Sequence, residues 1–372
     1  MLQLKFKPEL HYFDTCREFV EAFHVEKSDI VLTNEYIYQP FFGAYDLPAQ
    51  VICQEKYGAG EPTDVMVDAI LEAMENIPHR RIIAIGGGTV IDIAKVLAVA
   101  APGQRVDDLY ADVASLKAHC ELVIIPTTCG TGSEVTNISI LNRTKMGTKM
   151  GLVSESMFAK QAVLIPELLT RLPYYVFATS SLDALVHAVE SALSGKATPF
   201  TRLFSYKAIE MLVRGYQKMQ AEGLDARQAM LKDFLLASNY AGLAFGTAGC
   251  AAVHALSYPL GGTFHVPHGE ANYSIFIEVM KAYQKTGVHG ALKDMLDFLG
   301  GLLDCPAEEA FDRLGDLLTA ILPLKPLREY GMKEEHIKAF ASTVLASQQR
   351  LLGNNYVPLS EEQIAEVYAA RF

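Results

Sequence analysis

The pattern of apolar residues changes midway along the chain, and this change limits the fold more than any other feature. Before Pro173, short apolar runs alternate with segments whose apolar residues have helical spacing. After Pro173, nearly every segment has apolar residues three and four positions apart, as in residues 234–241. We therefore predict an α/β domain at residues 1–173, followed by an all-helical domain at residues 174–372.

The first half supplies the signals for a parallel sheet. Clusters of β-branched and aliphatic residues predict strands, and helical spacing predicts the helices between them. Pro62 precedes one helix and Asp64 lies in its first turn, which is typical of a helix start. Strands that alternate with helices imply a parallel sheet with helices on its faces. The predicted strands are residues 29–33, 81–85 and 122–125, and the predicted helices are residues 63–74 and 89–100.

Composition excludes several classes of protein. Lys and Arg number 32 against 43 Asp and Glu, a formal net charge of −11, whereas nucleic-acid and anionic-membrane partners need a basic surface. No apolar run approaches the ~20 residues of a membrane span, and the N-terminus lacks a signal-peptide pattern. The six cysteines form no C-x-x-C pair, which indicates reduced thiols in a cytoplasmic protein. Only Cys129 is expected to stand in a candidate site.

Three consecutive glycines follow the predicted strand at residues 81–85. Gly86, Gly87 and Gly88 let the backbone approach a ligand because they carry no Cβ atom. The next helix presents unpaired N–H groups and a positive dipole end, which suit a phosphate or pyrophosphate, and Thr89 adds a hydroxyl. Neither the G-x-G-x-x-G fingerprint nor a P-loop is matched. A tight turn without a ligand is the alternative.

A loop rich in hydroxyls follows the next predicted strand. Residues 126–134, P-T-T-C-G-T-G-S-E, hold four hydroxyls and two glycines. Ligands of open α/β sheets bind at the carboxyl ends of the strands. Two such loops after two strands favour a shared ligand, whereas either loop alone is also explained as a helix-capping turn.

The second half contains a candidate metal site. Asp183 and His187 lie four positions apart in a helical segment, so they share one face. His254, His265 and His268 fall within fifteen residues beside a bend rich in glycine and proline. One carboxylate and three imidazoles from these residues suit Fe²⁺, Zn²⁺, Co²⁺ or Mn²⁺, and affinity order alone does not choose among them. Polar loop histidines and an ordinary hydrogen-bonded helix pair are the alternative.

Together these motifs resemble those of the iron-dependent (group III) alcohol dehydrogenase family, over nearly the whole chain. Residues 85–95 resemble its G-G-G-S-x-x-D-x-x-K element, and residues 126–134 resemble its P-T-T-A-G-T-G-S-E loop, with Cys129 in place of alanine. Residues 183–190 resemble its D-A-L-x-H-A-x-E helix. Residues 254–269 resemble its H-x-x-x-H-P-x-G and P-H-G signature.

The resemblance implies a Rossmann-like domain that binds NAD, then a helical domain that binds a divalent metal, Fe²⁺ or Zn²⁺, with the active site in the cleft between them. It also implies a homo-oligomer, at least a dimer. The metal ligands it implies are Asp183, His187, His254 and His268. The residues it implies for the cofactor are Asn34, Gly86, Gly87, Gly88, Thr89, Asp92, Thr127, Thr128, Thr131, Ser133 and Lys149.

Two departures from the family pattern bear on the chemistry. Tyr258 stands where the family has the second histidine of H-x-x-x-H-P, so we expect Tyr258 or His265 to begin the proton path. Asn34 stands where many members have an aspartate that accepts from the cofactor ribose and repels a 2′-phosphate. Asn34 still binds a ribose and Glu35 adjoins it, so NAD is favoured over NADP.

The resemblance implies hydride transfer between NAD(H) and a primary alcohol or aldehyde. Residues 254–262, the chain length and the N-terminal sequence most resemble members that interconvert 4-hydroxybutyrate and succinate semialdehyde. The sequence does not identify a partner for the carboxylate of such a substrate. The alternatives are a glycerol, diol or simple-alcohol dehydrogenase of the same family, a metal-independent relative that acts on a carboxylate substrate, and a non-catalytic nucleotide-binding protein.

Overall fold

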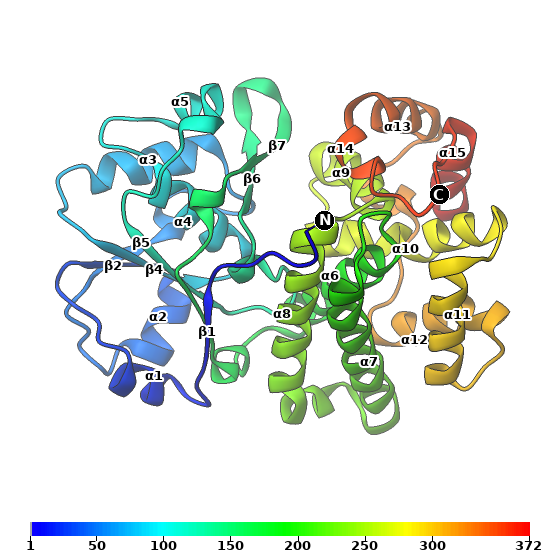
Figure 1. Cartoon of the computed structure of the whole chain (residues 1–372), viewed down its shortest axis with the longest axis horizontal. Coiled ribbons are helices and arrows are strands. Elements are labelled where there is room, and N and C mark those ends of the chain that lie inside the picture. The colour runs from blue at the N-terminus through cyan, green and yellow to red at the C-terminus, as the bar shows by residue number, and fades with distance from the viewer. Residues whose placement is uncertain (1) are drawn as a thin grey trace. The chain divides into compact units, whose positions relative to one another are not determined.

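The structure is a computed structural model that describes residues 2–372 (Figure 1). The chain divides into two compact units. Phe6–Leu172 form an α/β unit, and Pro173–Phe372, together with the N-terminal residues up to Lys5, form a helical unit. Each is described by itself.

The α/β unit is built on a six-stranded sheet in which every neighbouring pair runs parallel. The strands predicted from the sequence are confirmed, each to within one residue at its ends. The remaining three are four residues each, and two of them have at most one buried residue, so they lack a long apolar run. In sheet order the strands are β1 (Glu9–Tyr12), β8 (Gln161–Leu164), β5 (Glu121–Pro126), β4 (Arg81–Gly86), β2 (Asp29–Thr33) and β3 (Gln50–Cys53).

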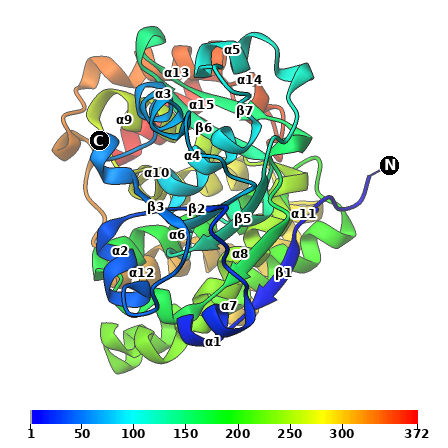
Figure 2. The same ribbon diagram turned by 90° about the vertical axis from the view of Figure 1, so that its left-hand side faces the viewer.

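Helices cover both faces of this sheet. Figure 2 shows α1 and α2 on one side and α3, α4 and α5 on the other. The predicted helix at 63–74 begins one residue later, because the Thr63 side chain accepts from the Met66 N–H and so acts as the N-cap. The helices are α1 (Cys16–Ala22), α2 (Glu35–Phe42), α3 (Asp64–Met74), α4 (Gly88–Val99) and α5 (Val106–Ala111).

An antiparallel hairpin adjoins α4 and was not predicted from the sequence. Its strands are β6 (Ile138–Arg143) and β7 (Thr148–Val153). The polar residues Asn142, Arg143, Thr148 and Lys149 lie at its turn end, and they mask the alternation of apolar and polar residues that marks a strand.

The helical unit is arranged around α6, which is buried from Phe177 to Leu193 apart from Ser180. Helices α7 and α8 pack along it, and α9 and α10 contact it as well. A capping box of Ser360 and Gln363 opens α15. None of the helices within residues 2–372 is long and apolar enough to cross a membrane. The helices are α6 (Tyr174–Leu193), α7 (Pro199–Glu222), α8 (Leu231–Ala248), α9 (Ala252–Phe264), α10 (His268–Lys285), α11 (Gly290–Leu303), α12 (Ala310–Ile321), α13 (Glu334–Ser347), α14 (Gln349–Leu352) and α15 (Glu361–Arg371).

Candidate functional site

Three helices of the helical unit bring one carboxylate and three imidazoles together. Asp183 and His187 lie on α6, His254 on α9 and His268 at the first residue of α10. One potential ligand atom from each lies within 4.8 Å of all the others. The first three residues are buried and His268 is partly exposed. The predicted donor set is therefore a spatial cluster, which we call the Asp–His cluster.

The spacing inside the Asp–His cluster suits a shared cation. The Nε2 atoms of His187 and His254 lie 3.0 Å apart, and His268 Nε2 lies 3.7 Å from Asp183 Oδ1. Ligand atoms about 2.1 Å from a tetrahedral metal ion lie about 3.4 Å from one another. The observed separations lie on both sides of that value, so the four residues fit a divalent ion.

Glu190 fixes one imidazole of the cluster. Its carboxylate lies 2.6 Å from His254 Nδ1 and accepts from the backbone N–H groups of Ala251 and Val253 at the start of α9. A ligand histidine that bonds a carboxylate through one ring nitrogen presents the other nitrogen to the metal. Glu190 therefore turns His254 Nε2 toward the cluster. The sequence carried a signal for this role, since Glu190 lies three residues after His187 and shares its helix face.

Asn272 is a second residue that the sequence did not single out. Its Nδ2 atom lies 2.8 Å from Asp183 Oδ1 and 3.2 Å from the Nε2 atoms of His254 and His268. The side chain is buried, and its Oδ1 atom has no hydrogen-bond partner among the described residues. In the sequence, the signal for Asn272 was its spacing of four residues from His268, which places both residues on one face of α10.

Close packing holds the helices that carry the cluster. At Gly269, a β-carbon would overlap the backbone oxygen of Thr179, so only glycine lets α10 approach α6 this closely. The His187 ring stacks on Phe245 of α8, with ring centres 4.3 Å apart.

Cys250 lies beside the cluster, contrary to the expectation that only Cys129 would stand in a candidate site. Its sulfur is within 4.8 Å of ligand atoms of Glu190 and His254. Burial by itself raises the pKa of this thiol, but the charges of His254 and His187 outweigh burial and lower the pKa to about 7. The position escaped prediction because the turn before α9, not a metal-binding spacing, brings the thiol to the histidines.

The two candidate proton-transfer residues lie in different surroundings. Tyr258 is one turn after His254 on α9, and its ring centre lies 6.5 Å from that of His268. Burial raises the pKa of Tyr258, and the positive charges of His254 and Arg350 partly oppose that rise. His265 ends α9 in the left-handed conformation (φ 56°) and is exposed. No described hydrogen bond, ion pair or ring contact joins its imidazole to the cluster.

In the α/β unit, the two predicted loops meet at one edge of the sheet. Thr33 pairs with Ile85 and Gly86 pairs with Pro126, so the segments that follow β2, β4 and β5 leave from the same edge. The Thr127 N–H donates to the Gly86 carbonyl at 3.0 Å. These contacts place the glycine turn beside the hydroxyl-rich loop.

The glycine turn leaves room and donors for an anion. A β-carbon at Gly87 would lie 3.3 Å from the Thr128 methyl, and one at Gly88 would lie 3.1 Å from the Thr131 methyl. Gly87 is the N-cap of α4 and carries no side chain to satisfy the first N–H groups of that helix. Those groups remain available to a phosphate.

Asp92 and Ser133 belong to a buried network. The Asp92 carboxylate accepts from the Ser133 hydroxyl at 3.1 Å and from the Ile140 N–H at 2.9 Å. Lys95 Nζ donates to the Ser133 hydroxyl at 2.6 Å and, because it is fully buried, its pKa is lowered to about 8. The network fastens the β6–β7 hairpin to α4, so these two predicted cofactor residues hold the loop in place.

Asn34 adjoins a carboxylate that the sequence did not single out. Its Nδ2 atom donates to Glu55 Oε2 at 2.9 Å and to Gln54 at 3.2 Å, and Glu55 Oε1 accepts from the Glu35 N–H at 2.6 Å. Glu55 follows β3, the neighbour of β2, so a reading of β2 and its own loop alone misses it.

Two further predicted cofactor residues contact a loop before α3. Lys149 Nζ lies 2.5 Å from Glu61 Oε2, and the Thr89 hydroxyl donates to the Gly60 carbonyl at 3.0 Å. Both side chains therefore lie at the same end of the α/β unit as the glycine turn.

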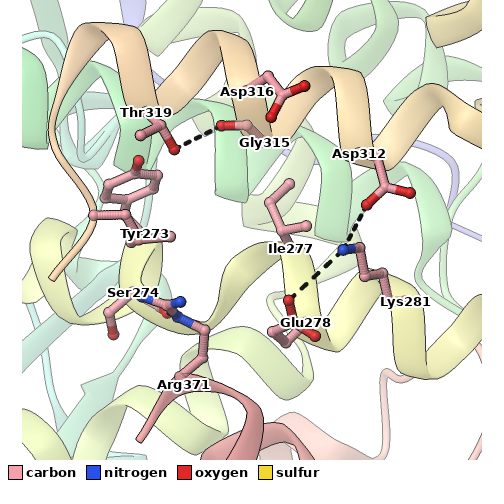
Figure 3. Close-up of a pocket in the computed structure, with 11 residues that line it drawn as sticks. Tyr273, Ser274, Ile277, Glu278, Lys281, Asp312, Gly315, Asp316, Thr319 and Arg371 are labelled. Atoms are coloured by element: carbon pink, nitrogen blue, oxygen red, sulfur yellow. Dashed lines mark hydrogen bonds and ion pairs between the residues drawn. The ribbon is translucent and has the colours of Figure 1, made fainter. Parts of the chain in front are cut away.

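A separate cavity of about 160 Å³ is lined by residues of α10, α12 and α15 (Figure 3). Its lysine and arginine side chains already have partners in the cavity wall. Lys281 lies 2.5 Å from Asp312 and 3.8 Å from Glu278, and the Arg371 guanidinium donates to the Ser274 carbonyl. We assign it no ligand.

Known proteins identify the class that this fold and cluster define. A sequence model of the iron-containing alcohol dehydrogenases matches residues 28–166, and a model of the Fe-containing alcohol dehydrogenase family, C-terminal part, matches residues 177–372. The chain belongs to the iron-containing alcohol dehydrogenase family.

Individual relatives are similar over most of their length. The chain is 49% identical to the 4-hydroxybutyrate dehydrogenase of Clostridium kluyveri over 99% of both chains. It is 33% identical to long-chain-alcohol dehydrogenase 1 of Geobacillus thermodenitrificans, over 93% of this chain and 90% of that protein. The sulfoacetaldehyde reductase of Bifidobacterium kashiwanohense, solved in complex with NAD⁺, has the same fold, with a TM-score of 0.86 at 23% identity over 100% of this chain and 99% of that one.

Proposed function

We propose that the protein is an NAD-dependent, metal-dependent 4-hydroxybutyrate dehydrogenase, which transfers a hydride between 4-hydroxybutyrate or succinate semialdehyde and NAD(H). The observation that carries the proposal is the Asp–His cluster, in a chain that is 49% identical to a 4-hydroxybutyrate dehydrogenase across 99% of its length. The family membership supports a divalent ion, with Fe²⁺ preferred and Zn²⁺ accepted.

The proposed metal ligands are the members of the Asp–His cluster. When bound, the ion supplies Lewis-acid polarisation of the substrate oxygen. Glu190 keeps His254 Nε2 free to bind by holding Nδ1. The unpartnered Oδ1 of Asn272 gives this amide spare acceptor capacity beside the ligands. The list of proposed ligands is Asp183, His187, His254 and His268.

The proposed dinucleotide site lies at the sheet edge of the α/β unit. Bound NAD supplies the hydride acceptor, and its reduced form supplies the donor. The N–H groups of residues 86–89 hold the pyrophosphate, and Thr127 and Thr128 lie near the adenine side of the cofactor. Thr131 adjoins Gly88. Lys149 and Asn34 bind on the ribose side, where the Glu55 carboxylate repels a 2′-phosphate and so favours NAD over NADP.

The alcohol proton must leave during oxidation and return during reduction. Tyr258 is proposed to begin this path because it stands on the same helix as His254 and faces His268. Its raised pKa keeps the hydroxyl protonated at neutral pH, so it passes a proton by donating and accepting hydrogen bonds rather than as a phenolate base. His265 is the second proposed member of the path, exposed at the end of the same helix.

We also propose a cytoplasmic enzyme that self-associates at least as a dimer. The free cysteines of the described chain and the absence of a membrane-spanning helix within residues 2–372 agree with this location. Small alcohols or aldehydes are the proposed partners, not nucleic acid, in keeping with the net charge of −11.

A substrate and cofactor screen tests the proposal. The metal-stripped protein is reloaded with Fe²⁺ or Zn²⁺, and reduced nicotinamide is followed by its absorbance with NAD or NADP. We expect 4-hydroxybutyrate with NAD to give the highest kcat/KM. Higher activity on butan-1-ol or propane-1,3-diol would favour the simple-alcohol function, which the similarity to a long-chain-alcohol dehydrogenase makes the second candidate. No metal binding and no turnover would indicate a non-catalytic protein.

A further inference from the structure

A second group of ligand-type side chains lies beside the Asp–His cluster. Ligand atoms of Glu190, Cys250 and His254 all lie within 4.8 Å of one another. At most 9% of the surface of each residue is exposed. A carboxylate, a thiolate and an imidazole are the three donor types with which proteins bind Zn²⁺. We call these three residues the Glu–Cys–His group.

The turn that carries Cys250 is fixed in place. Gly249, just before it, ends α8 at a positive φ of 79°, where glycine is favoured. The Asn354 amide donates to the Cys250 carbonyl at 2.8 Å. The Ala251 N–H, just after it, donates to Glu190 Oε2 at 3.0 Å. The backbone on both sides of the thiol therefore holds it near the Glu190 carboxylate.

His254 belongs to both groups of ligands, through different ring nitrogens. Its Nδ1 atom lies 2.6 Å from Glu190 Oε2, whereas its Nε2 atom lies 3.0 Å from His187 Nε2 in the Asp–His cluster. A neutral imidazole has one nitrogen with a free lone pair, because the other nitrogen carries the proton. His254 therefore gives a lone pair to only one of the two groups at a time.

We propose that the Glu–Cys–His group is a second, inhibitory site for the thiophilic cations Zn²⁺ and Cd²⁺, which compete with the Asp–His cluster for His254. The ion replaces the proton between His254 Nδ1 and Glu190, and that proton moves to Nε2. The Cys250 thiol releases its own proton to solvent as the metal–sulfur bond forms. A carboxylate and a thiolate then balance the two charges of the ion, as a buried site requires. Binding is independent of the proposed function, whereas the inhibition rests on it.

Titration of Cd²⁺ into the Fe²⁺-loaded protein, as the wild type and as Cys250→Ser, tests the inference. A cadmium–thiolate bond gives an ultraviolet charge-transfer absorbance, which a site of carboxylates and imidazoles lacks. We expect the wild type to gain this absorbance as it releases Fe²⁺ and loses NAD-dependent activity. Cys250→Ser should lack the absorbance. The Cd²⁺ concentration that releases half of the Fe²⁺ should rise at least about 10-fold in this variant, because one of three donors is lost.

Controls separate Cys250 from the other thiols and the second site from the proposed function. Cys305→Ser replaces another free cysteine of the helical unit and should titrate like the wild type. Cys250→Ala repeats the test without burying a hydroxyl, and thermal unfolding shows whether each variant is folded. Absorbance that persists in both Cys250 variants, or that appears while all Fe²⁺ is retained, would overturn the inference. A wild type that gains the absorbance and releases Fe²⁺, yet never oxidises 4-hydroxybutyrate, would keep the second site and overturn the proposed function.

Discussion

The two units assemble their candidate sites by different means. In the α/β unit, backbone N–H groups and hydroxyls come from loops that directly follow β4 and β5, so each half of the site is contiguous in sequence. In the helical unit, the Asp–His cluster takes side chains from α6, α9 and α10, spread over residues 183–268. A site made of backbone groups tolerates side-chain substitutions that preserve the backbone conformation. Metal binding by a side-chain cluster, in contrast, requires each of its members.

Removal of one cluster member should give the largest effect. For His268→Ala we expect loss of the bound divalent ion and a fall in kcat/KM of at least about 1,000-fold, because the proposed Lewis acid is lost. His268 is partly exposed at the start of α10, so its truncation leaves the helical core intact. Mass spectrometry measures the metal content of the helical unit. Fluorescence titration with NADH measures dinucleotide binding by the α/β unit.

The contrast between the units gives this variant an internal control. NADH affinity should remain within about threefold of the wild type, since the proposed dinucleotide residues lie in the α/β unit. Retained metal with full turnover would remove His268 from the ligand set.

The reciprocal change is Gly88→Val. A β-carbon at this position already lies 3.1 Å from the Thr131 methyl, and the valine methyls would occupy the space in front of the α4 N-terminus. We expect the Kd for NADH to rise about 100-fold while metal content stays unchanged. Gly301→Ala on α11, where a β-carbon meets open space, is the matched control. An unchanged Kd would show that the glycine turn does not carry the pyrophosphate.

Glu190→Gln sharpens the comparison from the side of the helical unit. The amide keeps the shape of the carboxylate but loses charge and acceptor capacity for His254 Nδ1 and the α9 N–H groups. Loss of such a partner costs about 10- to 100-fold in metal affinity. Competition with a chelator measures that affinity, and Glu210→Gln, at a partly exposed residue of α7, is the control. Equal metal affinity in Glu190→Gln and Glu210→Gln would show that Glu190 only caps the N-terminus of α9 and does not tune His254 for metal binding.

The same contrast explains what the sequence predicted. The strands at β2, β4 and β5 are continuous apolar runs, and the glycine turn is a local pattern, so both were found. Spacing and clustering also suggested a metal site from Asp183, His187 and the later histidines, and the family resemblance then selected His254 and His268 as the ligands. Residues that act across elements are harder to find: Glu55 beside Asn34 carries no short-range pattern, and Asn272 has only its spacing of four residues from His268. They become visible only when the tertiary structure places them.

The smallest expected effect concerns the buried Lys95 that holds the hydroxyl-rich loop. Its pKa falls from an ordinary value of 10.5 to about 8 because burial disfavours its charge. Between these values the unfolded state binds more protons, so stability rises with pH, by at most about 1.4 kcal/mol per pH unit. Urea unfolding at pH 7.5 and pH 9.5 should therefore show a gain in the wild type relative to Lys95→Met. If the two proteins share one pH dependence, Lys95 does not titrate in this range.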